Sequence, residues 1–145
     1  MRSAFLEQNS GITAGVKKKV ENVTVARTLT NDESGKVFML DSTGGAYSVT
    51  LPTALEDGVY WKFVVSEETP TGAITIAAGS AIVSMVMKDA GGNASNSTAG
   101  TQVSNIVIGT SAQKGDYINI MAAGGEWVAE CLSSIDDAVT TSYPK

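Results

Sequence analysis

The chain has 145 residues, of which 43% are hydrophobic and 17% charged, and its formal net charge is −5. This length and hydrophobic content are typical of a single domain with its own core. The sequence contains no histidine and one cysteine, Cys131, which excludes histidine-based acid–base catalysis, Ser–His and Cys–His nucleophile pairs, and metal sites built from His or Cys. No cofactor is predicted.

Two classes of partner are also excluded. No apolar run approaches the roughly 18 residues that a membrane-spanning helix needs. The acidic net charge gives no reason to expect a nucleic-acid partner, because proteins that bind nucleic acids carry clustered positive charge. A secretory leader is not predicted, since Glu7, Gln8 and Asn9 interrupt the apolar stretch that it would need.

The first 27 residues differ in charge from the rest of the chain. Residues 1–27 hold five basic and two acidic residues, whereas residues 28–145 hold five basic and thirteen acidic ones. A basic segment before an acidic body predicts an arm that binds an acidic partner; the alternative is a solvated segment whose lysines only aid solubility. The candidate binding residues of this arm are Arg2, Phe5, Leu6, Ile12, Lys17, Lys18, Lys19 and Arg27.

The body of the chain shows the two-residue alternation of β-strands rather than the 3.6-residue period of helices. In the clearest segment, residues 59–65, the side chains of Val59, Trp61, Phe63 and Val65 share one face, which predicts a central strand with one buried side. The other predicted strands cover residues 20–30, 36–40, 47–51, 73–77, 81–87, 103–109, 116–122 and 126–132.

Turns and polar segments lie between and after these strands. Residues 31–35 and the pair Gly124-Gly125 have turn-forming composition, and glycine tolerates the positive φ that tight hairpins need. Residues 89–100 contain no large apolar side chain, which predicts a long surface loop. Residues 133–145 predict a peripheral polar tail.

About eight or nine short strands joined by Gly-rich turns predict one all-β domain over residues 28–132. We expect a single-domain β-sandwich or jelly-roll-like barrel, preceded by the extended arm, with its sheets meeting over one apolar layer. A small closed barrel is the alternative. Few Lys or Pro residues protect the predicted edge strands, so we expect the chain to assemble into a symmetric oligomer.

The acidic residues do not form a predicted catalytic pair or metal site. Adjacent carboxylates occur at Asp32/Glu33, Glu56/Asp57, Glu67/Glu68 and Asp136/Asp137. All four pairs lie in predicted turns or tails, where solvated surface charge is their usual role and a glycosidase pair is a minor alternative. Residues 31–33 and 41–43 offer oxygen ligands for Ca²⁺, but no EF-hand loop is present, so no metal site is predicted. We predict that the protein is not an enzyme.

Cys131 and the two tryptophans each have a structural and a chemical interpretation. Cys131 shares a strand face with Trp127 and Ala129 and has no neighbouring base, which favours a buried, inert thiol. Trp61 and Trp127 would stack on sugars if they lined a lectin-like face. Their same-face neighbours are apolar, so packing in the core is favoured.

Several segments together resemble a known architecture. They are TLTNDESGKVFML (28–40), YSVTLP (47–52), GVYWKFVV (58–65), ITI (74–76), KGDYINI (114–120) and GEWV (125–128). This pattern of strand and turn residues resembles the small β-sandwich modules of tailed bacteriophage virions, over about residues 28–132. The resemblance implies a virion structural protein, either a head decoration (cement) protein, usually a trimer seated on the capsid, or part of a tail fibre or spike.

The sequence favours the decoration role. The chain from Met1 to Lys145 shows neither the repeats nor the heptads of a fibre, so we expect a free-standing module. Its expected partners are the major capsid protein of the same virion and, in a trimer, copies of itself. After synthesis in the host cytoplasm, its basic arm would bind across the outer surface of the head. A tail-fibre or spike module, structural or carbohydrate-binding, is the alternative.

Overall fold

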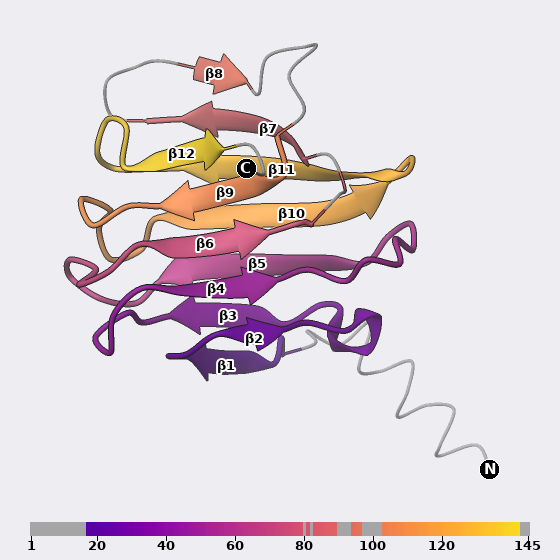
Figure 1. Cartoon of the computed structure of the whole chain (residues 1–145), viewed down its shortest axis with the longest axis horizontal. Helices are drawn as coiled ribbons and strands as arrows, with labels where there is room; N and C mark the ends of the chain where they lie inside the picture. The colour runs from indigo at the N-terminus through magenta and orange to yellow at the C-terminus, as the bar shows by residue number, and fades with distance from the viewer. Residues whose placement is uncertain (1–16, 80, 82, 90–93, 97–102, 143–145) are drawn as a thin grey trace.

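The protein is a two-layered β-structure (Figure 1). The computed structural model describes residues 17–142 except 80, 82, 90–93 and 97–102. Within these ranges, two sheets pack face to face, and the one helical element is a short 3₁₀ helix, η1 (Asn31–Glu33). The predicted all-β sandwich is confirmed.

Seven strands form one sheet and five form the other. The seven-stranded sheet contains, in spatial order, β1 (Val20–Val23), β3 (Val37–Leu40), β5 (Tyr60–Val65), β10 (Tyr117–Ala123), β11 (Glu126–Leu132), β7 (Val83–Lys88) and β8 (Ala94–Asn96). The five-stranded sheet contains β12 (Val139–Ser142), β9 (Asn105–Ile108), β6 (Ile74–Ala77), β4 (Tyr47–Thr50) and β2 (Arg27–Thr28).

The first six strands form a coil, in which the chain alternates between the two sheets. Strands β1, β3 and β5 run parallel in one sheet, and β2, β4 and β6 run parallel in the other, so the chain changes sheet after every strand (Figure 1, indigo to magenta). A jelly roll consists of antiparallel strands, so that part of the prediction is not confirmed. Side-chain alternation is the same in parallel and antiparallel strands, and therefore does not reveal which neighbour a strand takes.

A hairpin closes the coil in the second half of the chain. Strands β10 and β11 pair with each other, and they also pair with β5 and β7, respectively. Gly124 and Gly125 have φ of 65° and 83°, as the two central residues of a type I′ hairpin turn require. The predicted glycine turn is confirmed, and it brings two long strands into the middle of the seven-stranded sheet.

The core is the apolar layer between the sheets. Trp61 of β5 and Trp127 of β11 are 1% and 0% exposed, with ring centroids 5.5 Å apart. Phe38 and Phe63 stack beside them with centroids 5.7 Å apart. The indole nitrogen of Trp61 donates a hydrogen bond of 2.9 Å to the carbonyl oxygen of Glu33. The predicted inward face of residues 59–65 is therefore confirmed.

Three segments differ from the sequence prediction. The expected strand at 20–30 is two strands in opposite sheets, so regular structure begins inside the segment assigned to the arm. The expected loop at 89–100 contains β8, which pairs with β7. The expected tail at 133–145 contains β12, which pairs with β9, and Ala138 and Val139 are each 1% exposed. Short edge strands such as β12 bury so few residues that their composition remains polar.

Gly72 lies at a position with no space for a side chain, and this can be tested. A Cβ atom on Gly72 would lie 2.3 Å from the backbone nitrogen of Ala46, whereas a Cβ on Gly44 would have its nearest contact at 4.0 Å. We expect Gly72→Ala to lower the free energy of unfolding by about 2–3 kcal/mol, because backbone must move to relieve the overlap. Gly44→Ala is the matched control, and chemical denaturation of both variants makes the comparison. Equal stability of the two variants would contradict the close approach.

Candidate binding face

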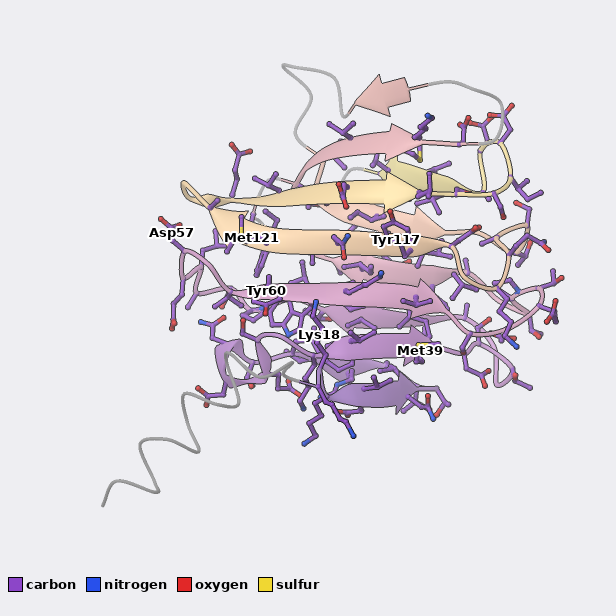
Figure 2. All side chains as sticks on the ribbon, turned by 180° about the vertical axis from the view of Figure 1, so that it is seen from behind. Lys18, Met39, Asp57, Tyr60, Tyr117 and Met121 are labelled. Atoms are coloured by element: carbon purple, nitrogen blue, oxygen red, sulfur yellow. The ribbon has the colours of Figure 1, made fainter. Side chains whose placement is uncertain are left out.

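An exposed apolar patch lies on the outer face of the seven-stranded sheet. The strand register places Tyr60 of β5 opposite Met121 of β10, and Met121 opposite Val128 of β11. These three side chains are each 44% exposed, and Val86 of β7 is 61% exposed. Figure 2 views this face and labels Tyr60 and Met121 on adjacent strands. We call Tyr60, Val86, Met121 and Val128 the apolar patch; contiguous exposed apolar surface of this kind marks interaction sites.

Basic side chains flank the apolar patch on the side of β1, β3 and β5. A depression of about 580 Å³ is lined by the patch and by Lys18, Lys36 and Lys62, whereas Asn119 of β10 and Glu130 of β11 line the same depression. The Nζ atom of Lys18 lies 5.9 Å from the ring centroid of Tyr60, and that of Lys62 lies 4.4 Å from the ring centroid of Tyr117. These are cation–π contacts at the surface. The depression is therefore suited to a partner that offers apolar groups flanked by negative charge.

The outer face of the five-stranded sheet has a different chemistry. The register aligns Ser48, Thr75, Val107 and Thr140 in one row across β4, β6, β9 and β12. Three of these four side chains carry hydroxyls, and none is charged. Hydroxyl groups stay hydrated at little cost, so this face has less to gain from burial than the apolar patch.

The residues assigned to the arm fall into separate groups. Four of them, Arg2, Phe5, Leu6 and Ile12, lie outside the described residues. Lys17, Lys18 and Lys19 are exposed immediately before β1, and Lys18 reaches the apolar patch. The structure therefore brings the lysine run and this sheet face together, which the charge pattern alone did not reveal.

Arg27 belongs to a charge cluster inside the fold rather than to a free arm. Its guanidinium donates to the carboxylates of Glu21 and Glu33, and Lys36 donates to the same two carboxylates at 3.0 and 3.2 Å. The Arg27 Cζ atom lies 5.2 Å from the ring of the buried Phe38. β1 and β2 are edge strands, and inward-pointing charges discourage a second chain from pairing there. This edge is therefore better protected than the sequence indicated.

The charge cluster holds its carboxylates ionised. Hydrogen bonds from Lys36 and then from Arg27 lower the pKa of Glu21 from its ordinary value of 4.5. Burial raises the pKa of Glu33, but the backbone N–H of Thr30 and the Lys36 ammonium outweigh burial and lower it overall. Stability from these groups is therefore present above about pH 4.5 and is lost as the pH falls through their folded-state pKa values.

Of the other acidic residues in the predicted pairs, several have structural partners and two lie in one cluster. Asp57 Oδ1 accepts a hydrogen bond of 3.0 Å from the N–H of Gly124 at the hairpin turn. Glu67 accepts from the N–H of Ser42. Asp136 and Asp137 lie beside Asp89, and electrostatic repulsion from Asp89 raises the pKa of Asp136.

The turn at 41–43 offered oxygen ligands for calcium in the sequence. In the structure, its carboxylate accepts hydrogen bonds from within the turn. Asp41 Oδ1 accepts hydrogen bonds from the backbone N–H and the hydroxyl of Thr43, at 2.8 and 2.6 Å. These bonds, that of the hydroxyl first, lower the pKa of Asp41. The Asp41 carboxylate thus has an internal role in the turn.

The buried positions of Cys131 and the tryptophans decide between their two interpretations. Cys131 is 4% exposed, and burial raises the pKa of its thiol to about 12, so the reactive thiolate is disfavoured at neutral pH. Trp61 and Trp127 lie in the core. The predicted core packing is confirmed, and neither indole is available to stack on a sugar.

The sequence-based prediction missed the apolar patch. Its members are outward positions of strands that were predicted correctly, but they come from four segments between residues 60 and 128. A signal was present, because large apolar residues occupy outward positions where Ser and Thr occupy them in the other sheet. The strand order was needed to show that these positions are neighbours.

Comparison with known proteins adds no relative: the sequence matches no protein-family model and no curated protein. The part of the chain that the structure describes has no helix with the length and apolarity to cross a bilayer. The virion modules named above therefore remain a resemblance carried by the strand and turn residues.

The charge cluster predicts a pH-dependent stability difference. We expect Arg27→Ala to lower the free energy of unfolding at pH 7 by about 1–2 kcal/mol, because it leaves two partly buried carboxylates with one cation. The effect should shrink at a second, acidic pH below the lowered pKa values of Glu21 and Glu33, where both carboxylates are protonated. Lys114→Ala is the matched control, since Lys114 and Glu68 form a pair whose side chains are 60% and 87% exposed. Urea denaturation at both pH values measures the effect, and a pH-independent loss would contradict this account.

Proposed function

We propose that this protein is a head decoration protein of a tailed bacteriophage, which binds the outer surface of the assembled shell and stabilises it. The resemblance of residues 28–132 to virion β-sandwich modules points to this class. The burial of Cys131, Trp61 and Trp127, together with the structural partners of the acidic pairs, is consistent with a role in binding rather than catalysis.

The observation that carries the proposal is the joint position of the apolar patch and the lysines. Lys18 and Lys62 line the depression on the β1–β5 side of the patch, and Lys36 lies there paired with Glu21 and Glu33. Lys17 and Lys19 flank Lys18 in the sequence. This arrangement is complementary to a shell surface with apolar side chains among carboxylates. The apolar groups supply affinity through burial, while the ammonium groups guide the approach and fix the orientation.

Stabilisation of the shell would follow from selective binding. If the protein binds the assembled shell and not free shell subunits, each occupied site favours assembly by RT ln(1 + [L]/Kd). No covalent step is required. In a trimer, three binding faces would act together, so a weak contact at each one would give strong attachment overall.

The trimer is proposed on the sheet edges that the charge cluster does not protect. β12 (Val139–Ser142) is the last strand of the five-stranded sheet and pairs with β9 on one side. Its other side has no strand partner within the described residues, and such an edge is suited to pairing with another copy.

The second candidate is a carbohydrate-binding module of a tail fibre or spike. The observation that favours it is the polar row within the same depression, where Asn119 donates a hydrogen bond of 2.8 Å to Glu130 near the exposed Tyr60. An aromatic ring beside amide and carboxylate groups is a common sugar-binding arrangement. Quenching of protein fluorescence by a panel of glycans, with no binding to heads, would favour this candidate.

The binding face is tested by replacing apolar side chains of the patch with charged ones. We expect the double variant Met121→Glu, Val128→Glu to bind phage heads at least tenfold more weakly, because it places two charges in the apolar patch. Ser48→Glu with Thr75→Glu, a directly opposed pair on the outer face of the five-stranded sheet and away from the β12 edge, is the matched control. Co-sedimentation with heads lacking their decoration protein measures binding, and circular dichroism verifies the fold. Equal loss in both variants, or in neither, would reject this face.

The arm is tested separately. We expect removal of residues 2–16 to weaken head binding while leaving the domain folded, because β1 begins only at Val20. The deletion stops before Lys19, whose carbonyl oxygen accepts a hydrogen bond of 2.9 Å from the N–H of Val37. Replacing Lys17, Lys18 and Lys19 by Gln should weaken binding further and reduce its dependence on salt. Full binding by both variants would reject the arm.

A further inference from the structure

Three carboxylates converge where the chain leaves the seven-stranded sheet. Asp89 directly follows β7, while Asp136 and Asp137 lie in the connection from β11 to β12. One carboxylate oxygen from each residue lies within 4.8 Å of those of the other two. Among the described residues, no lysine or arginine forms an ion pair with any of the three. Lys88 and Lys114 line a depression together with Asp89, but neither forms an ion pair with the cluster among the described residues.

Asp89 is the unusual member of this cluster, because it is buried. Its exposed fraction is 7%, and its Oδ1 atom is shielded from solvent and has no hydrogen-bond donor among the described residues. A buried carboxylate oxygen without a partner costs free energy that folding rarely leaves uncompensated.

Asp116 shows how this fold otherwise treats a buried carboxylate. It is 5% exposed and accepts three hydrogen bonds, at 2.9 Å from the N–H of Gln113, 2.8 Å from the N–H of Ser134 and 3.3 Å from the hydroxyl of Ser133. Asp116 is therefore satisfied by its own chain. The contrast leaves Asp89 Oδ1 open to a group that the described residues do not supply, and a cation or a proton shared with Asp136 would each meet this need.

We propose that Asp89, Asp136 and Asp137 bind a calcium ion. Carboxylate oxygens are the ligands that hard divalent cations take, and the absence of His and of any second Cys excludes a typical zinc site. Calcium accepts six to eight oxygens in flexible geometry, so three carboxylates from two irregular segments suit it, with water or backbone oxygens completing the shell. Magnesium requires a near-ideal octahedron and keeps most of its water.

The ion would connect parts of the fold that are distant in the sequence. Asp89 ends β7, and the segment with Asp136 and Asp137 carries the chain from the seven-stranded sheet to β12 in the five-stranded sheet. A bound cation would fix this crossover and thereby β12. The site is independent of the binding face, so its test does not depend on head binding.

The test compares calcium with magnesium on the full chain after removal of metal by EDTA. We expect calcium to raise the melting temperature progressively from micromolar to millimolar concentrations, with magnesium at least tenfold less effective. Isothermal titration should give one calcium ion per chain. An absent calcium response, or an equal response to magnesium, would overturn the proposal.

Variants of the three aspartates distinguish a bound cation from a proton that two of the carboxylates share. In EDTA, Asp89→Asn should melt no lower than the parent chain, since it removes a buried charge, yet its response to calcium should be lost. Asp136→Asn with Asp137→Asn should weaken calcium binding at least tenfold, and it tests the proposal on exposed residues if Asp89→Asn does not fold. Asp32→Asn, at an exposed acid outside the cluster, should keep the full response. A calcium response that survives in all variants would overturn the proposal.

Discussion

The apolar layer between the two sheets is the interaction on which the rest of the structure depends. Trp61 contacts Trp127 there, Phe38 stacks on Phe63, and all four side chains are at most 1% exposed. Burial at about 25 cal/mol per Å² of apolar surface makes this layer the main source of stability. Each strand must direct alternate residues into it, and the other residues then form the two outer faces. The position of the binding face is therefore a consequence of how the core is filled.

The coiled path of the chain explains the position of the basic residues. β1 is the first strand of the coil and the edge of the seven-stranded sheet, so the lysines before it emerge beside the outer face of that sheet. The coil begins with β1 and β2, which are edge strands of the two sheets. The charge cluster around Arg27 lies at this edge. Within a few residues of one another, basic side chains therefore serve two purposes. Arg27 stabilises the edge, while Lys17–Lys19 are exposed to solvent.

The lysine run and the aspartate cluster lie on opposite sides of the molecule. The lysine run lies at the β1 edge, whereas Asp89, Asp136 and Asp137 lie where β7 and the β11–β12 connection meet, at the other side of the sandwich (Figure 1). In the proposed decoration role, the binding face meets the shell through its lysine-bearing side. The proposed calcium site would then serve the stability of the far side.

Length, composition and alternation were sufficient to predict an all-β sandwich, the inward face of residues 59–65, the glycine hairpin and the burial of Cys131, because each follows from a local pattern. The parallel coil, β12 and the role of Arg27 were not predictable in this way. They depend on which strands become neighbours, and a two-residue period is identical for every choice of neighbour. The apolar patch and the cluster of Asp89 with Asp136 and Asp137 have the same origin. Their members come from different segments of the chain, and only the order of the strands in the seven-stranded sheet brings them together.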